Sequence, residues 1–262
     1  MADPLLGKLL WYELLTTDMN AAKAFYTGII GWTTKPFDVG NSQPYEVLND
    51  AAGRGIGGIM PKPEGMNVPP HWVMYIGVPK IEDAIAHIER LGGSGMSPLM
   101  DIPNVGRIRT MKDPQGAMFS ILEPAPSERT PDAQPGLGDA SWHELYTTNA
   151  EAAIHFYSEV FGWQPTDTYD IGPMGKYYMF GRSFPLGGMM TKSPEMEKAG
   201  APTAWGIYFR VADVDAAAQQ VKANGGMVIN GPMDVPGGDR VVMCTDPQGA
   251  MFSLHRPAGQ PS

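Results

Sequence analysis

The sequence predicts an α+β protein made of two tandem copies of one domain, each with two β-α-β-β-β modules that form a U-shaped curled sheet with outer helices. Three observations predict this class. The string DPQGAMFS occurs at residues 113–120 and again, letter for letter, at 246–253. Residues 9–32 match 140–163, and residues 71–93 match 204–226. Because all three spacings are about 130 positions, the chain holds duplicated domains and not a solenoid of short repeats.

The boundaries of the two copies follow from composition. The segment PAPSERTPDAQPGLGD at 124–139 is rich in proline and has no periodic apolar pattern, which is typical of an extended linker. We therefore expect one domain at 1–123, a linker at 124–139 and a second domain at 140–262.

Local signals give the elements of the first module in order. Large side chains alternate over 9–16, which suits a half-buried strand. Asp18 can cap the helix that follows, and Thr148 or Asn149 can do so in the second copy. Gly31 and Gly162 then end the helices, and short strands with turn glycines follow.

The second module repeats this order. WVMYIGV reads as a strand, IEDAIAHIERLGG as a helix ended by paired glycines, and RIRTMKDPQGAMFSIL as a hairpin. The turn of the hairpin is DPQG, in which proline at the second position and glycine at the fourth favour a type I turn. The aspartate can accept a hydrogen bond from the turn backbone.

Charge and composition exclude several classes of function. Acidic residues outnumber basic ones 28 to 19, and no run of lysine or arginine suits a nucleic acid or an anionic membrane surface. No apolar stretch reaches the ~20 residues of a membrane helix, and Asp3 lies where a signal peptide is basic. The single cysteine, Cys244, lies in an apolar run that suits a buried thiol. We expect a cytoplasmic protein.

These residues resemble a known family. The strand followed by TTDMNAAKAFYTGIIGW, its copy TTNAEAAIHFYSEVFGW, the helix entry VADVDAAAQQ and the hairpin D-P-x-G are similar to the vicinal oxygen chelate superfamily of glyoxalases, extradiol dioxygenases and bleomycin-resistance proteins. More narrowly, the chain resembles duplicated members labelled hydroxylases or culture-filtrate antigens. The resemblance implies a cleft in which a divalent metal commonly holds vicinal oxygens of a substrate.

The resemblance also implies where metal ligands would lie. The first-strand position falls on Trp11 and Trp142, and the fifth-strand position on Val73 and Gly206. The position seven residues after the turn aspartate falls on Ser120 and Ser253, where metal-binding relatives carry glutamate. The remaining position lies in GIGGIM and PLGGMM, which offer no carboxylate. Since these side chains are poor ligands for divalent cations, we predict that the usual metal site is absent.

Strand alternation places other side chains on the cleft face. Glu13 shares a face with Trp11, and Glu144 with Trp142. Along the fifth strands this face includes Tyr75 and Tyr208. A carboxylate on an aromatic wall suits general acid or base catalysis. We predict Glu13 and Glu144 as catalytic or anchoring residues, and the following as substrate-binding residues: Trp11, Tyr75, Ser120, Trp142, Tyr208 and Ser253.

Alternative readings remain open. Glu13 and Glu144 can be structural partners of a loop backbone or of Arg107 and Arg240, which lie at matching places. His143 lies beside Glu144, but alternation points it away from the cleft, toward the helix side or solvent. A metal could instead be held by relocated ligands such as His71, Glu13 and His255.

The leading hypothesis is a protein that binds a small apolar or aromatic molecule without metal, like the bleomycin-resistance branch. The alternative is an enzyme, a lyase, isomerase, hydroxylase or dioxygenase-like protein, that uses Glu13 or Glu144 for proton transfer. No nucleotide-binding glycine loop or C-x-x-C motif occurs, so no cofactor is predicted. The expected partner is a small-molecule ligand or substrate, with no nucleic acid and no membrane, and the chain is a monomer or a homodimer.

Overall fold

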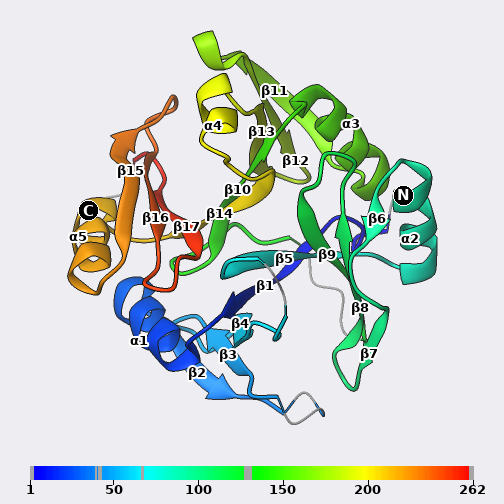
Figure 1. Cartoon of the computed structure of the whole chain (residues 1–262), viewed down its shortest axis with the longest axis horizontal. Coiled ribbons are helices and arrows are strands. Elements are labelled where there is room, and N and C mark those ends of the chain that lie inside the picture. Colours follow the sequence, from blue (N-terminus) through cyan, green and yellow to red (C-terminus); the bar gives the residue numbers. More distant parts are fainter. Residues whose placement is uncertain (1–2, 39, 41–42, 66–67, 127–131, 260–262) are drawn as a thin grey trace. The chain divides into compact units, whose positions relative to one another are not determined.

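The computed structural model describes residues 3–38, 40, 43–65, 68–126 and 132–259. Contacts divide the chain into two compact units, and each takes segments from both repeats. The first unit comprises Met1–Leu10, Met74–Gln134 and His143–Trp205, and the second comprises Trp11–Val73, Pro135–Trp142 and Gly206–Ser262. The chain passes from one unit to the other within four strands, β1 (Leu9–Thr16), β5 (His71–Gly77), β10 (Ala140–Thr147) and β14 (Ala204–Arg210), and again between Gln134 and Pro135. Figure 1 labels these strands.

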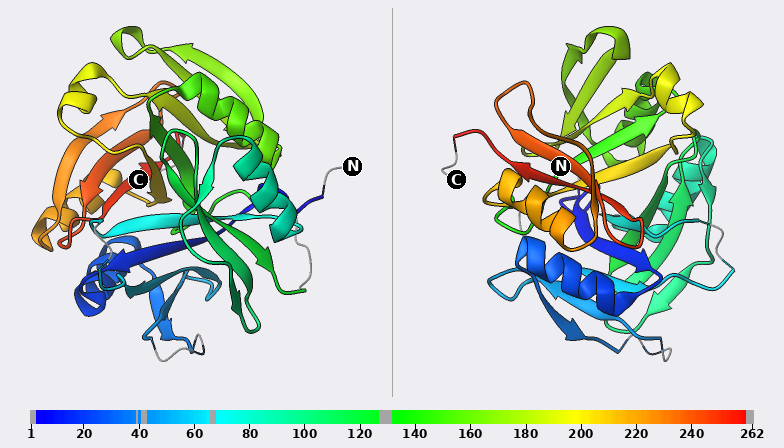
Figure 2. Two further views of the ribbon diagram at one scale, coloured as in Figure 1. Left: turned by 45° about the vertical axis from the view of Figure 1, so that its right-hand side comes forward. Right: turned by 60° about the vertical axis from the view of Figure 1, so that its left-hand side comes forward.

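The second unit joins the first module of repeat one to the last module of repeat two. Its elements are β1 (Leu9–Thr16), α1 (Met19–Ile30), β2 (Thr33–Pro36), β3 (Glu46–Asn49), β4 (Gly55–Pro61), β14 (Ala204–Arg210), α5 (Val214–Ala223), β15 (Met227–Asp234), β16 (Arg240–Thr245) and β17 (Met251–Arg256). The strand orders are β2-β3-β4-β1 and β14-β17-β16-β15. The pairs β1–β4 and β14–β17 are parallel, and α1 packs beside α5 (Figure 2).

The first unit joins the two remaining modules. Its elements are β5 (His71–Gly77), α2 (Ile81–Arg90), β6 (Ser94–Gly95), β7 (Met100–Ile102), β8 (Gly106–Lys112), β9 (Met118–Pro124), β10 (Ala140–Thr147), α3 (Ala150–Phe161), β11 (Gln164–Asp170), the 3-10 turn η1 (Gly172–Met174), β12 (Lys176–Gly181), β13 (Pro185–Thr191) and α4 (Pro194–Lys198). The strand orders are β5-β9-β8-β6, with β7 also on β8, and β11-β12-β13-β10. Helices α2 and α3 are in contact (Figure 2).

The predicted helix signals are confirmed. The Asp18 carboxylate accepts a hydrogen bond from the Ala21 amide at 3.0 Å, and Asn149 does the same for Ala152 at 3.0 Å. Both helices end at a glycine in the left-handed region, Gly31 at φ 85° and Gly162 at φ 68°, where a side chain would be strained. The α+β class with tandem modules and curled sheets is thus as predicted.

Both DPQG segments form turns and also join the repeats. Asp113 accepts hydrogen bonds from the backbone N–H groups of Gln115 and Ala117, and its second oxygen accepts one from the Tyr157 hydroxyl at 3.1 Å. In the second unit Asp246 forms the same turn and accepts from the Tyr26 hydroxyl at 3.1 Å. Each tyrosine comes from the repeat that does not supply the turn. Burial raises the pKa of both carboxyls.

Aromatic side chains fill the core of each unit around these tyrosines. In the second unit Tyr26 stacks on Trp32 and meets Trp72 edge-on, and in the first unit Tyr157 stacks on Trp163 and meets Trp205 edge-on. The Trp72 and Trp205 indoles each donate to the tyrosine hydroxyl at 3.0 Å. These tryptophans therefore belong to the core. Cys244 is buried, as predicted.

Candidate functional site

The first-strand glutamates of the two repeats lie in equivalent places. Glu13 on β1 pairs in register with Gly58 on β4, and Glu144 on β10 pairs with Gly188 on β13. Both carboxylates are half-buried. Burial alternates along β10 around Glu144, whereas three successive residues after Glu13 on β1 are all buried.

Glu13 accepts a hydrogen bond from a tyrosine that the sequence reasoning did not single out. The Tyr45 hydroxyl donates to Glu13 Oε1 at 2.9 Å, and the Trp11 indole N–H donates to the same hydroxyl at 2.9 Å. Trp11 therefore acts on Glu13 through Tyr45. Burial, and next the charge of Glu13, raises the pKa of Tyr45 far above its ordinary value, so the phenol stays protonated and remains a donor.

The second repeat builds the same contact. The Tyr177 hydroxyl donates to Glu144 Oε1 at 2.9 Å, and Tyr146 donates to the other oxygen of this carboxylate. Tyr146 lies two residues after Glu144 on β10, and the corresponding residue of repeat one is Leu15. The two carboxylates thus share one tyrosine contact and differ by a second.

The glycines opposite the glutamates make room for these tyrosines. A Cβ atom on Gly58 would lie 2.1 Å from the Tyr45 hydroxyl, and one on Gly188 would lie 2.1 Å from Cζ of Tyr177. Any larger side chain would displace the ring. Gly58 in GIGGIM and Gly188 in PLGGMM, the segments to which the resemblance assigns a metal ligand, each lie against a phenol that reaches the first-strand carboxylate.

The alternative that Glu13 and Glu144 are structural partners of Arg107 and Arg240 is wrong. Arg107 bonds to Glu82 and lies 3.7 Å from Glu123, both in its own repeat. Arg240 likewise binds Asp215 and Asp234. These arginines therefore serve carboxylates on the helices and strands of their own modules.

The remaining predicted binding residues lie on the fifth and last strands of each repeat. Tyr75 pairs in register with Ser120, and Tyr208 with Ser253. All four side chains are buried. The Ser120 hydroxyl shares a hydrogen bond of 3.0 Å with Thr110, whereas the residue opposite Ser253 on β16 is Met243. Trp142 is half-buried on β10, two residues before Glu144.

The positions that the resemblance assigns to metal ligands carry an indole, a hydrocarbon and a hydroxyl in the first repeat. Trp11 uses its indole N–H on Tyr45, Val73 is a buried hydrocarbon, and Ser120 is a neutral hydroxyl bonded to Thr110. Within the described ranges no three His, Cys, Asp or Glu side chains come together as a ligand set, and this includes the relocated set of His71, Glu13 and His255.

The histidines have other partners. His143 is 2% exposed and its Nδ1 lies 2.8 Å from the Leu186 carbonyl; burial lowers its pKa to about 4. The side chain does point away from Glu144, but into packed structure and not into solvent. His71 Nδ1 lies 2.8 Å from the Pro69 carbonyl.

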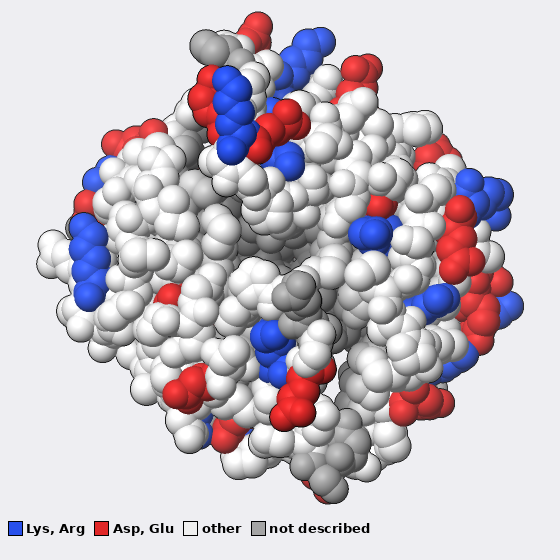
Figure 3. All heavy atoms as spheres, in the orientation of Figure 1, with Lys and Arg blue, Asp and Glu red and all other residues white. Residues whose placement is uncertain are grey.

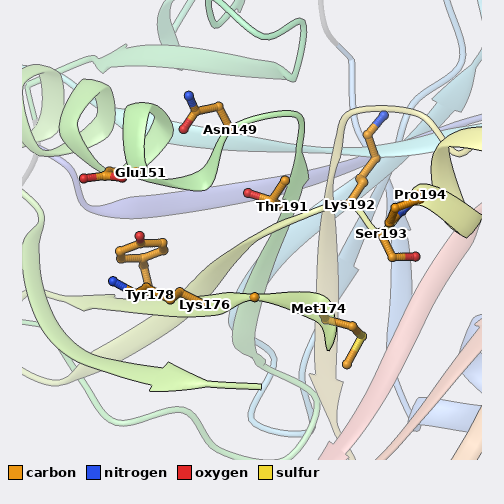
Figure 4. A pocket seen from close by; sticks show the side chains of 10 residues that line it. Asn149, Glu151, Met174, Lys176, Tyr178, Thr191, Lys192, Ser193 and Pro194 are labelled. Atoms are coloured by element: carbon orange, nitrogen blue, oxygen red, sulfur yellow. The ribbon is translucent and has the colours of Figure 1, made fainter. Parts of the chain in front are cut away.

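A pocket of about 430 Å³ lies elsewhere in the first unit (Figure 4). Asn149 and Glu151 line it at the start of α3, Lys176 and Tyr178 on β12, and Lys192 after β13. It contains none of the predicted site residues. On the face shown in Figure 3, acidic and basic side chains are interspersed. None of the helices in the described part is long and apolar enough to cross a bilayer.

Comparison of the sequence with known proteins identifies its family and its relatives. The family model described as "Glyoxalase/Bleomycin resistance protein/Dioxygenase superfamily" matches residues 8–121 and 140–254. The chain is 32% identical over 252 residues to the "Putative glyoxylase CFP32" of Mycobacterium tuberculosis, covering 95% of each chain. It is 27% identical over 262 residues to the "Anthracycline biosynthesis protein DauV" of Streptomyces sp., covering 95% of this chain and 92% of that one.

Solved structures show the same fold. The Mn(II)-bound glyoxalase of Novosphingobium aromaticivorans superposes with a TM-score of 0.63 at 15% identity, covering 95% of this chain and 82% of that one. The 2,3-dioxygenase LapB of Pseudomonas sp. KL28 superposes with a TM-score of 0.66 at 13% identity, covering 98% and 95%. At such low identity these likenesses concern the fold alone.

Proposed function

Because the chain belongs to the Glyoxalase/Bleomycin resistance protein/Dioxygenase superfamily, we propose that it binds a small apolar or aromatic molecule whose polar group is anchored by Glu13 or Glu144, without the family's usual metal. One observation carries the proposal. A half-buried carboxylate bonded to a protonated tyrosine stands opposite a glycine in both repeats.

The chemistry of this pair suits recognition of a hydrogen-bond donor. A carboxylate is an acceptor, and a phenol that holds one of its oxygens fixes its orientation. Each carboxylate oxygen can accept more than one hydrogen bond, so a ligand hydroxyl, amine or enol could donate to the same carboxylate as the tyrosine, while Trp11 or Trp142 offers an aromatic surface. Since one relative is named for anthracycline biosynthesis, a polycyclic aromatic compound with hydroxyl groups is the first ligand class to test.

The variants Glu13→Gln and Glu144→Gln test the anchor. Removing the charge from a hydrogen bond to a ligand costs about 1.5–3 kcal/mol, which is roughly a tenfold to hundredfold loss of affinity at that site. Titration calorimetry against a panel of hydroxylated aromatic compounds measures it. Glu159→Gln on the exposed face of α3 is the matched control and should bind like the wild type. Unchanged affinity in both site variants would refute the anchor.

A second candidate is proton transfer by the same carboxylates, in a lyase, isomerase or hydroxylase-type reaction. The phenol beside each glutamate favours it, because a protonated donor could stabilise a developing oxyanion on a substrate while the carboxylate takes a proton. Turnover that falls in Tyr45→Phe or Tyr177→Phe while binding persists would distinguish this candidate from simple binding.

The proposal that the chain lacks the family's usual metal is tested by a separate measurement. After incubation with Mn, Ni, Zn or Fe(II) and desalting, elemental analysis should give far less than one ion per repeat. About one tightly held ion per repeat would overturn it.

A further inference from the structure

A second group of polar side chains lies in the second unit, apart from the glutamates. Ser141 is on β10, His255 is on β17, and Asp239 lies directly before β16. The Ser141 hydroxyl lies 2.7 Å from Nδ1 of His255, and Nε2 of His255 lies 2.9 Å from an Asp239 carboxylate oxygen.

The hydrogen-bond partners fix the tautomer of the histidine. A carboxylate can only accept, so Nε2 carries the proton that is donated to Asp239, and Nδ1 accepts from the Ser141 hydroxyl. The hydroxyl has an alternative acceptor in the Tyr208 carbonyl, but that oxygen is 3.4 Å away. The other Asp239 oxygen accepts from the Ala258 amide at 2.8 Å, which holds the carboxylate in place.

The environment keeps the imidazole neutral and able to accept a proton. His255 is 6% exposed, and burial lowers its pKa, with Asp239 acting in the opposite direction and Arg210 in the same one. Ser141 is half-buried. A nucleophile, a base in hydrogen-bond reach and a third group that orients the base are the arrangement of serine acyl transfer. Here Nδ1 faces the serine and Nε2 faces the carboxylate, the reverse of the usual arrangement. The chemistry allows this because either ring nitrogen can act as the base.

The fold does not require these residues. The corresponding positions of repeat one are Leu10 and Leu122, on strands β1 and β9 that form without a polar group there. Burying a serine and a histidine where leucines suffice costs free energy unless their hydrogen bonds are made. The substitution is therefore specific to repeat two and is not explained by duplication.

We propose that Ser141 is an activated nucleophile that is acylated by small carboxylic esters, with His255 as the base and Asp239 as the positioning residue. Ser141 Oγ forms a bond to the ester carbonyl carbon as its proton moves to Nδ1 of His255. The bond between this carbon and the alcohol oxygen breaks, and the alcohol leaves with that proton. Water then attacks the acyl-serine by the same route, which releases the acid and restores Ser141.

Covalent labelling of the intact chain tests the proposal. Treatment with a fluorophosphonate should add one stable group per chain, and treatment with the smaller p-nitrophenyl acetate, quenched in acid before the acyl-serine hydrolyses, should add one acetyl group, each located at Ser141 by peptide mass spectrometry. Ser141→Ala should abolish the labelling, whereas Ser94→Ala on the exposed strand β6 should leave it unchanged. Absence of a label at Ser141 with both reagents on folded wild-type protein overturns the proposal, and this result does not depend on any variant folding.

A further pair of variants tests the role of Asp239. Asp239→Asn should slow labelling at least about tenfold, because it removes the acceptor that holds the imidazole in the required tautomer. Asp239→Glu, which keeps a carboxylate, should recover part of the rate. Equal labelling rates in the wild type and both variants would show that Asp239 does not position His255. Glu159→Gln, on the exposed face of α3, should label like the wild type.

Discussion

Gly58 and Gly188 determine whether a tyrosine can reach the first-strand carboxylate. A methyl group at Gly58 would come within 2.1 Å of the Tyr45 hydroxyl and 2.3 Å of its ring. Gly58→Ala must therefore displace the whole ring and break its bond to Glu13. We expect a loss of about 1–3 kcal/mol in the free energy of unfolding, measured by chemical denaturation.

Gly28 is the control for this substitution. It lies inside α1, and a Cβ atom there would meet nothing within 4 Å. Gly28→Ala should stabilise the protein by about 0.5–1 kcal/mol through helix propensity alone. Equal effects of the two substitutions would show that Tyr45 does not depend on the glycine.

The buried aspartates of the two DPQG turns predict a dependence of stability on pH. Burial raises the folded pKa of Asp113 and Asp246 above the ordinary value of 3.8. The stability that these groups contribute is therefore fully present below pH 3.8 and is lost as pH rises through the folded pKa. The unfolding free energy of the wild type, minus that of an Asp113→Asn, Asp246→Asn variant, should fall over this range. A difference that rises with pH would contradict the account.

At the residue scale the sequence predicts part of the candidate site. Alternation along the first strands places Glu13 and Glu144 in equivalent positions, and register confirms that equivalence. The tyrosines were missed because they lie in the segment where the repeats align with gaps. Their signal was present, since Tyr45 and Tyr177 are 132 positions apart, between the offsets of 131 and 133 that relate the flanking repeats. Only strand pairing shows that a residue before β3 reaches β1.

At the scale of single elements, the first residues of three helices allow the effect of side-chain capping on stability to be compared within one chain. Asp18 and Asn149 cap their helices through a side-chain hydrogen bond, whereas Lys80 at the start of α2 makes none. Asp18→Ala and Asn149→Ala should each cost about 1 kcal/mol of stability, and Lys80→Ala should change it by less than about 0.5 kcal/mol. Thermal or chemical unfolding measures all three. A Lys80 effect as large as the other two would contradict the capping explanation.

Elements with strong local signals were predicted, and short ones were not. The helices with caps and terminal glycines and the DPQG hairpins occur where expected. Helix α4 and strand β7 were not predicted, since one is a single turn after Ser193 and the other exists by pairing with β8. Such elements depend on neighbours and not on their own periodicity.

At the scale of the whole molecule, the repeats and the compact units are different divisions of the chain. The sequence shows the duplication, but it contains no signal for which modules pack together. Each unit takes one module from each repeat, and Tyr26–Asp246 and Tyr157–Asp113 join them. The boundaries at 1–123, 124–139 and 140–262 remain a prediction about repeats.

Because each compact unit takes one module from each repeat, we predict that neither repeat folds well alone. A fragment of 1–123 would expose Tyr26, Trp32 and Trp72, which pack with residues of repeat two. Fragments 1–123 and 140–262, made separately, should be unstable or self-associated, and mixing them should restore native near-ultraviolet circular dichroism. A fragment 1–123 that is a stable monomer with the full stability of the whole chain would contradict the arrangement.

We propose that a carboxylate held by tyrosine takes over the place of the family's metal in ligand recognition. Titration of hydroxylated polycyclic aromatics into protein treated exhaustively with a chelator tests this most directly. We expect saturable binding without metal that weakens in the Glu13→Gln, Glu144→Gln double variant. Binding that appears only after one equivalent of a divalent ion per repeat is restored, and that ignores both substitutions, would contradict it.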